Sequence, residues 1–367
     1  MRNVLAIFLA LTVGVEALAQ CRATLVMEPQ TGKILHEENG DQPFPTASMT
    51  KMMTLLVVIE EIEDGRLEWD ARVRTSAKAS RMGGSQVYLK HDELFTVREM
   101  VEATMVHSAN DAAMALAEHV AGTEEGFVEL MNRRAEELGL ENTTYVTPHG
   151  LPDPARPDDT MSPRDLAVLG SEVMKHPELR RLAAIDKMPF RDGTFTLYNP
   201  NHLIGSYPGA TGIKTGYHNG AGFCVTASAR KGALELIAVS MGCGKKESFD
   251  TAAALMSRYF NAYRMLLPVR EGMELEKPLR VRDGANAAVP VKAGASFPVL
   301  ADRRTDPTLA LVVSSIGVAA PIREGQQIGW ILVEQDGKPV GKVPALAAAS
   351  VDRASWFSRT WDKVWPF

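Results

Sequence analysis

The sequence is poor in the residues that build disulfide frameworks, metal sites and phosphate loops. Only three cysteines occur among 367 residues, at positions 21, 224 and 243, and so few cannot staple a fold of this size. A hairpin turning near residues 231–232 would place Cys224 opposite about Val239, so we expect Cys224 and Cys243 to stay free. No histidine stands at metal-ligand spacing from another histidine or cysteine, and no dinucleotide fingerprint occurs. We therefore predict no metal and no cofactor.

The chain also lacks a run of basic residues and an excess of positive charge. Its formal net charge is −5, which provides no positive field for a phosphate backbone, so nucleic acid is not an expected partner. A hydrophobic content of 45% with 23% charged residues is typical of a globular protein. Because single cores stop growing near about 250–300 residues, this length predicts two domains.

No apolar stretch is long enough to cross a bilayer. The run from Val4 to Val15 falls short of the roughly 20 residues that a spanning helix needs. It follows Arg2 and precedes Ala17-Leu18-Ala19, the small-x-small layout of a signal peptidase site. We expect residues 1–19 to be a signal peptide and the chain to be exported. An uncleaved anchor and lipidation of Cys21 are alternatives, although Gln20 is large for the residue before a lipidated cysteine.

The first expected domain, residues 20–267, mixes helical and strand periodicities. A helix is expected from Ser48 to Glu63, and Gly212–Tyr217, Gly222–Arg230 and Leu234–Met241 are expected as adjacent strands. This pattern predicts an α+β fold, with an antiparallel sheet and a helical block. Further helices are expected at Val97–Val106, Asn110–Val120, Glu124–Leu138, Pro163–Lys175 and Phe249–Leu266.

The chain after Pro268 changes to short β-type runs separated by glycine and charged turns. We expect a small all-β, sandwich-like domain at residues 268–344. Ala345–Ala349 is expected to be a linker within the segment 345–367. The end of that segment, from Asp352, holds three of the five tryptophans, with aromatic and basic residues at helical spacing. It predicts an amphipathic helix at a membrane surface, or alternatively a helix docked on the β domain.

A serine and a lysine stand three residues apart at the start of the first predicted helix. Ser48 and Lys51 share one helix face at this spacing. A serine hydroxyl is a poor nucleophile and needs a base, and a lysine with a depressed pKa can serve as one. Taken alone, the pair is equally consistent with Ser48 as a helix N-cap.

Two further polar clusters strengthen the interpretation. Ser108 and Asn110 lie in a predicted turn between helices, where side chains can relay a proton or hold a substrate amide. Lys214, Thr215 and Gly216 lie on a predicted strand to which an extended peptide can add. Ser-x-x-Lys, Ser-x-Asn and Lys-Thr-Gly in this order form the motif set of penicillin-binding proteins and class A β-lactamases.

From about Ala23 to Leu266 the chain resembles the D-alanyl-D-alanine carboxypeptidases among the low-molecular-mass penicillin-binding proteins. The resemblance implies a penicillin-binding, β-lactamase-like transpeptidase fold, with Ser48 as nucleophile, Lys51 as its base and Ser108 as a proton relay. It also implies substrate contacts from Asn110, Lys214, Thr215, Gly216 and Tyr217, the last standing where many relatives have histidine. Lys246 is expected in the place of an arginine that helps bind the substrate's terminal carboxylate.

The implied reaction removes the terminal D-alanine from peptidoglycan stem peptides ending in D-Ala-D-Ala, through an acyl-enzyme on Ser48. β-Lactams are expected inhibitors, and the expected location is the periplasmic face of the cytoplasmic membrane. The alternatives are a DD-endopeptidase, a β-lactamase of the same fold, and a non-catalytic peptidoglycan-binding scaffold.

Overall fold

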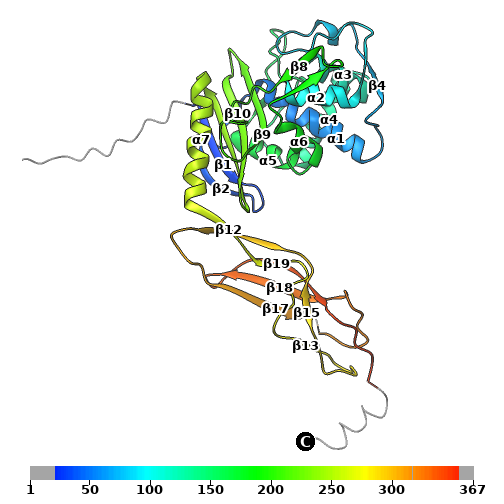
Figure 1. Cartoon of the computed structure of the whole chain (residues 1–367), viewed down its shortest axis with the longest axis vertical. Helices are drawn as coiled ribbons and strands as arrows, with labels where there is room; N and C mark the ends of the chain where they lie inside the picture. Colours follow the sequence, from blue (N-terminus) through cyan, green and yellow to red (C-terminus); the bar gives the residue numbers. More distant parts are fainter. Residues whose placement is uncertain (1–20, 316, 355–367) are drawn as a thin grey trace, which may run out of the picture. The chain divides into compact units, whose positions relative to one another are not determined.

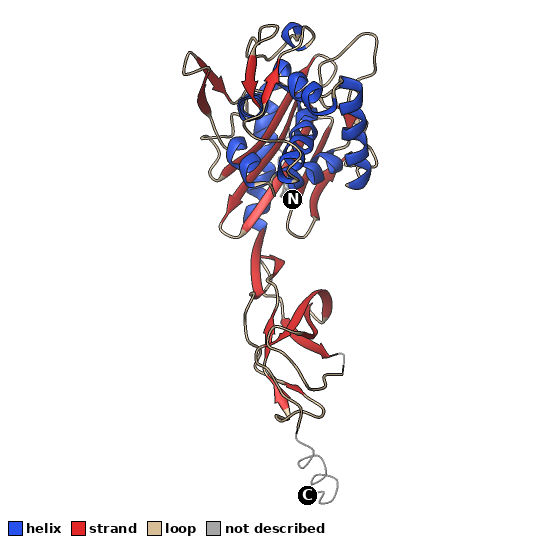
Figure 2. Ribbon diagram, turned by 90° about the vertical axis from the view of Figure 1, so that its right-hand side faces the viewer, coloured by secondary structure: helices blue, strands red, loops and turns tan. Residues whose placement is uncertain are grey.

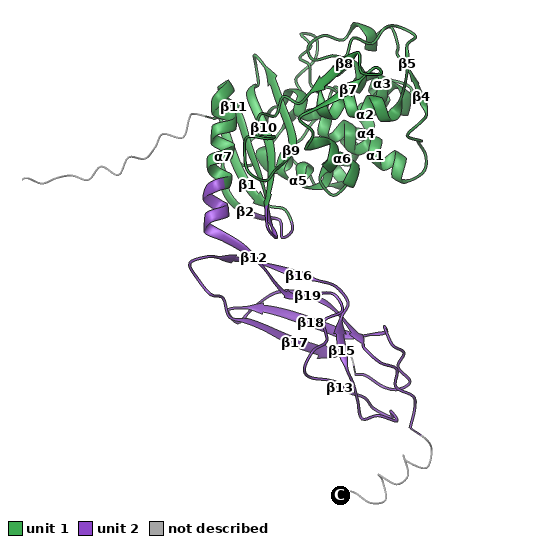
Figure 3. Cartoon of the chain, in the orientation of Figure 1, with its two compact units in different colours: residues 1–29, 34–230, 236–256 green, residues 30–33, 231–235, 257–367 purple. Residues whose placement is uncertain are grey.

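A computed structural model describes residues 21–315 and 317–354, which form two compact units (Figure 1, Figure 3). The first unit contains the chain up to Pro29, Ile34–Arg230 and Leu236–Met256. The second contains Gln30–Lys33, Lys231–Glu235 and the chain from Ser257 onward. The expected signal peptide and C-terminal amphipathic helix lie outside the described residues, the latter from residue 355.

A five-stranded sheet forms the centre of the first unit. Its spatial order is β2 (Lys33–Glu38), β1 (Ala23–Glu28), β11 (Leu234–Cys243), β10 (Gly222–Lys231) and β9 (Ala210–His218). The pairs β1–β11 and β9–β10 are antiparallel. All of β1 and most of β10 and β11 are buried, as expected where both faces of a sheet are covered. The three strands expected after residue 210 are confirmed.

Helices cover the sheet, and Figure 2 shows them lying over the strands of this unit. The local sequence explains their ends. Thr96 and Glu99 form a capping box at the start of α2, and Ser162 caps α5 by accepting from the Asp165 amide. The expected helices between residues 48 and 175 are confirmed within a few residues at their ends. They are α1 (Lys51–Glu63), preceded by the 3₁₀ helix η1 (Ala47–Thr50), then α2 (Val97–Val106), α3 (Asn110–Ala121), α4 (Glu124–Glu137) and α5 (Pro163–Val173).

Several short elements of this unit were not expected from the sequence. A helix, α6, packs against β9, and the short hairpin formed by β7 and β8 has only four residues in each strand. Runs of two to seven residues carry too little periodicity to be recognised. These elements are α6 (Pro177–Ala183), β3 (Phe44–Pro45), β4 (Arg72–Arg74), η2 (Ala79–Arg81), β5 (Leu94–Thr96), β6 (Thr160–Met161), β7 (Lys187–Phe190) and β8 (Phe195–Tyr198).

The last helix, α7, occupies Lys245–Ala262 and not Phe249–Leu266. Its C-terminal part was expected wrongly, because Tyr263–Val269 forms strand β12 and pairs with β16 from Tyr263↔Asp302 onward. Ladder hydrogen bonds and burial in this pairing outweigh helical periodicity. The N-terminal extension begins with the polar residues Lys245, Lys246 and Glu247, which carry no apolar periodicity.

From Tyr263 onward, the described elements of the second unit are all β-strands, as the sequence predicts. Its largest sheet has the order β15-β19-β18-β17, and a core of valine, isoleucine and alanine side chains stabilises it. The expectation of a linker at Ala345–Ala349 is wrong in part, because residues up to Ala347 belong to β19 and pair with β15. The strands are β12 (Tyr263–Val269), β13 (Leu279–Arg280), β14 (Ala288–Val289), β15 (Val291–Ala293), β16 (Phe297–Asp302), β17 (Leu309–Ser315), β18 (Gln327–Gln335) and β19 (Lys338–Ala347).

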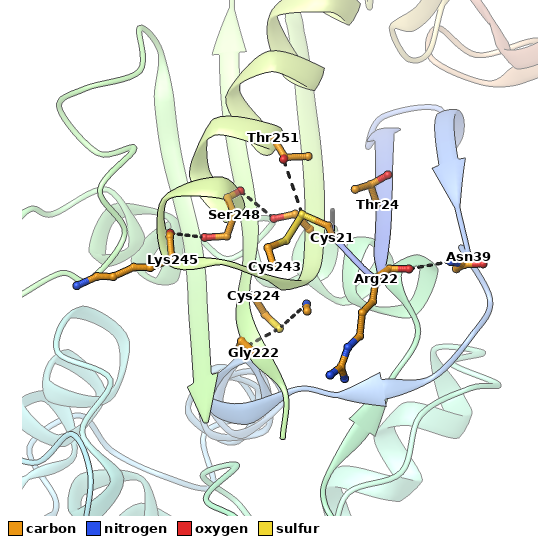
Figure 4. Close-up of a disulfide and its surroundings, with 12 residues drawn as sticks. Cys21, Arg22, Thr24, Asn39, Gly222, Cys224, Cys243, Lys245, Ser248 and Thr251 are labelled. Carbon is orange, nitrogen blue, oxygen red and sulfur yellow. Dashed lines mark hydrogen bonds between the residues drawn. A yellow bond between two sulfur atoms is a disulfide. The ribbon is translucent and has the colours of Figure 1, made fainter. Parts of the chain in front are cut away.

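A disulfide joins Cys21 to Cys243, which corrects the expectation that Cys243 stays free. Figure 4 shows the bond beside α7, with Thr251 of that helix facing Cys21. Strand β1 pairs with β11 from Ala23↔Met241, and continuing this register by two residues places Cys21 opposite Cys243. The expectation considered only the β10–β11 hairpin, and Cys21 comes from a different strand region 222 residues away in the sequence. Cys224 is free and buried, as expected, and a disulfide-bonded Cys21 excludes its lipidation.

Candidate active site

The candidate nucleophile and base occupy the junction between η1 and α1. The Lys51 Nζ atom donates a hydrogen bond of 2.8 Å to Ser48 Oγ and another of 2.6 Å to the backbone carbonyl of His149. The i, i+3 spacing puts both side chains on one face, as the sequence predicts. Ser48 is only partly buried, so its hydroxyl remains accessible while the amine behind it is enclosed.

Burial favours the neutral form of the Lys51 amine. The side chain is fully buried, and the loss of hydration lowers its pKa well below the ordinary value, helped by repulsion from Lys214. The carboxylates of Asp159 and Asp111 oppose this shift. A neutral amine has a free lone pair, and so Lys51 can accept the proton of the Ser48 hydroxyl.

Lys214 is a second buried amine near this pair. Only 2% of the residue is exposed, and burial lowers its pKa to about 7. Within the described chain, its Nζ atom has no hydrogen-bond partner, and the same holds for Ser108 Oγ and Asn110 Oδ1. Such groups are costly unless they serve a function. Three unsatisfied polar atoms at one site are therefore suited to receiving a polar substrate.

The three motifs meet at one cavity of about 530 Å³. Six of the nine candidate residues line it, namely Ser48, Ser108, Asn110, Thr215, Gly216 and Tyr217. Lys51 and Lys214 are not among its lining residues; Lys51 is hydrogen-bonded to Ser48 and interacts electrostatically with Lys214. Lys246 is the exception, as described below.

Two glycines allow the backbone to approach the nucleophile closely. A Cβ atom on Gly216 would lie 2.5 Å from the Thr46 carbonyl oxygen and 3.2 Å from the Ser48 amide nitrogen. A Cβ atom on Gly150 would lie 1.9 Å from the Ala47 carbonyl oxygen, and its φ of +78° also favours glycine. Strand β9 and the turn at Gly150 thus enclose the Ser48 backbone from two directions.

The structure places Lys246 outside the cavity. Its side chain is 85% exposed and lies 3.8 Å from Asp250, one helical turn along α7. The preceding residue, Lys245, lines the cavity instead, and in Figure 4 its side chain extends away from the disulfide. Because α7 starts four residues earlier than expected, the sequence did not indicate which of the two lysines faces the site.

Tyr217 lines the cavity mouth, where it is 53% exposed. Its ring stacks on that of Phe223 with 4.1 Å between centroids, and its hydroxyl donates to Asn219 Oδ1. The side chain is therefore held in place while one part of it stays open to solvent.

The sequence missed several residues that shape the cavity. Asp111 is buried and accepts hydrogen bonds from the amides of Val87 and Leu89, which fixes the loop that contributes Gly84 and Ser85. Its position directly after Asn110 was an available signal. Tyr198, Asn199 and His202 also line the cavity, but they come from the connection around the unrecognised hairpin, so no sequence pattern pointed to them.

The described residues contain no cluster of three or more histidine, cysteine, aspartate or glutamate side chains that could hold a metal ion. In the same part of the chain no helix is long and apolar enough to cross a membrane.

Known protein families match the sequence of both units. A family model described as D-alanyl-D-alanine carboxypeptidase matches residues 12–245. The chain belongs to this family. A second model, the C-terminal domain of penicillin-binding protein 5, matches residues 263–353. Membership in the family identifies the protein as a serine hydrolase with a penicillin-binding-protein fold and a β-rich C-terminal domain.

Individual relatives of the family match nearly the whole chain. D-alanyl-D-alanine carboxypeptidase DacF of Bacillus subtilis is 32% identical, covering 92% of this chain and 88% of its own. DacC of Escherichia coli is 30% identical over 94% of this chain and 87% of its own. The crystal structure of penicillin-binding protein 5 from Haemophilus influenzae superposes with a TM-score of 0.76 at 28% identity, covering 91% and 98% of the two chains.

Proposed function

We propose that this protein is a serine-type D-Ala-D-Ala carboxypeptidase that removes the terminal D-alanine of peptidoglycan stem peptides. The observation that carries the proposal is the 2.8 Å hydrogen bond between the buried Lys51 amine and Ser48, at a cavity lined by residues of the other two motifs. Lys51 takes the Ser48 proton as Oγ attacks the carbonyl of the penultimate D-alanine. The terminal D-alanine then leaves as an amine, and water hydrolyses the ester on Ser48.

The remaining candidate residues have roles that follow from their positions. The amides of Ser48 and Tyr217 are proposed to hold the developing oxyanion, and such a donor typically contributes about 3–4 kcal/mol. Ser108 relays the proton to the leaving amine, and Asn110 holds the substrate amide. Lys214 and Thr215 bind polar groups of the substrate beside the nucleophile. We assign the terminal carboxylate to Lys245 in place of Lys246, because Lys245 lines the cavity.

The alternatives have less support. The D-alanyl-D-alanine endopeptidase of Pseudomonas aeruginosa matches over only 55% of this chain, whereas carboxypeptidases match over more than 90%. A β-lactamase needs a base that activates the deacylating water, and no carboxylate is among the described residues that line the cavity. A non-catalytic scaffold would not need the unsatisfied polar groups of this site.

We also propose that β-lactams acylate Ser48, since their strained amide resembles the scissile bond. Structures of penicillin-binding protein D2 from Listeria monocytogenes with ampicillin and with cefotaxime are similar to this chain, with a TM-score of 0.60 at 29% identity.

The experiment is to compare the wild type with Ser48→Ala. The wild type should release D-alanine from a pentapeptide and become covalently labelled by a fluorescent penicillin. Ser48→Ala should lose both, by at least about 1000-fold for the turnover, while its melting temperature stays close to that of the wild type. Retained release of D-alanine would contradict the assignment.

We further propose export to the periplasm and attachment to the outer face of the cytoplasmic membrane through the tryptophan-rich C-terminus. The disulfide supports export, because disulfides persist in oxidising compartments. The composition of residues 352–367 supports the attachment.

A further inference from the structure

Asp159 lies outside the three motifs, yet its backbone contacts the segment that carries the nucleophile. Strand β6 pairs with β3 at Pro45↔Thr160, which places Asp159 beside Thr46, two residues before Ser48. The Asp159 carbonyl accepts hydrogen bonds of 3.0 Å from the Thr46 amide and 3.2 Å from the Thr46 hydroxyl. All of these groups are buried, so the entry into η1 is firmly held.

The side chain of the same residue holds the segment behind the base. One carboxylate oxygen accepts from the amides of Val146 at 2.6 Å and Thr147 at 3.0 Å, and the other accepts from the Thr147 hydroxyl at 2.6 Å. Burial of this 3% exposed carboxyl raises its pKa. The three hydrogen bonds from Thr147 and Val146, and the charge of Lys51, oppose the shift because they favour the ionised carboxylate.

Thr147 connects Asp159 to Lys51 through the turn at His149 and Gly150. Its hydroxyl oxygen accepts from the amides of His149 at 3.3 Å and Gly150 at 2.8 Å. The His149 carbonyl, fixed by this turn, is the second acceptor of Lys51 Nζ, at 2.6 Å. Asp159 therefore contacts the segment that carries Ser48 through its backbone. Through its side chain it contacts the turn that presents the His149 carbonyl to Lys51.

The Asp159 charge also acts on the amine directly. Among the charged groups that influence Lys51, Asp159 and Asp111 raise its pKa, while Lys214 and burial lower it. The nearby His149 ring is neutral, because burial lowers its pKa to about 3. Removing the Asp159 charge leaves only one of the two opposing carboxylates.

We propose that Asp159 is a positioning residue for acylation, which sets the distance between Ser48 and Lys51 and balances the charge on the amine. The inference rests on the proposed function. No sequence motif marks Asp159. The β3–β6 pairing brings its backbone to Thr46, and its carboxylate is bonded to Thr147.

The test measures the rate of Ser48 acylation by a fluorescent penicillin as a function of pH. Asp159→Asn should lower the rate by on the order of 100-fold, because its amide presents a donor to the Thr147 hydroxyl and displaces the turn. On the acidic side of the pH–rate profile, the rise in the acylation rate should move to lower pH. The reason is that Lys51 loses a nearby carboxylate that favours its protonated form. Thr147→Val should lower the rate without moving this rise, because it keeps the charge.

The neighbouring Asp158→Asn provides the matched control, and it should change neither the rate nor the position of this rise. Melting temperatures establish that each variant is folded. Should Asp159→Asn not fold, Thr147→Val decides the question alone. A folded Asp159→Asn, or in its place a folded Thr147→Val, with the wild-type rate and profile would overturn the inference. A wild type that is not labelled at Ser48 would instead refute the proposed function.

Discussion

Two adjacent lysines on α7 provide a test at the scale of single residues. Lys245 lines the cavity, whereas Lys246 is exposed beside Asp250. Lys245→Ala should raise KM for a peptide ending in D-Ala-D-Ala by about 10-fold or more, the value of a lost hydrogen bond to a charged group. Lys246→Ala should leave KM unchanged. Steady-state release of D-alanine measures both KM values. A larger KM for Lys246→Ala than for Lys245→Ala would show that Lys246 binds the substrate carboxylate.

The buried Lys214 amine should make the free energy of unfolding depend on pH. An unfolded lysine titrates near about 10.4, whereas burial lowers the pKa of Lys214 in the folded protein to about 7. Between these values the unfolded chain binds the extra proton, so the free energy of unfolding falls as pH decreases from about 10.4 to about 7. Lys214→Met should remove this part of the slope and stabilise the protein at pH 7 by about 1–3 kcal/mol, since a buried unsatisfied group is removed.

Urea unfolding at pH 7 and pH 9 measures this difference. The exposed Lys246→Met is the control and should follow the wild type at both pH values. An unchanged slope in Lys214→Met would mean that Lys214 stays protonated in the folded protein. The stabilised variant should lose acylation, because it lacks the amine beside Ser48.

At the scale of elements, the disulfide joins Cys21, two residues before β1, to Cys243 at the end of β11. The double variant Cys21→Ser/Cys243→Ser should lower the free energy of unfolding by about 2–4 kcal/mol, because the unfolded chain regains the freedom that the cross-link removes. A reductant should reproduce this loss in the wild type and have no further effect on the double variant. Equal stability with and without reductant would show that the bond does not contribute.

The same elements show what the sequence could and could not predict. Long periodic segments such as α2, α3 and α4 were recognisable. The three motifs, at the η1–α1 junction, at the start of α3 and on β9, pointed to one cavity. The sequence alone could not predict contacts that depend on the register between strands far apart in the chain. The Cys21–Cys243 bond, the role of Asp159 and the orientation of Lys245 all require knowing which strands pair or where a helix starts, and no local pattern contains that information.

At the scale of the whole molecule, the chain divides into two compact units. The candidate active site lies within the first unit. Deleting Asp352–Phe367 should therefore leave penicillin labelling of Ser48 intact and move the mature protein from the membrane fraction to the soluble fraction. Sedimentation after cell lysis measures this shift. Continued sedimentation with membranes would refute the proposed anchor.

The position of β1 in the sheet has a consequence for biosynthesis. The first strand to be translated lies between β2 and β11, and β11 is translated more than two hundred residues later, at Leu234–Cys243. A nascent polypeptide that ends before β11 exposes an unpaired edge on β1, so it cannot complete its central layer. Chains released early by the ribosome should consequently be substrates for proteolysis.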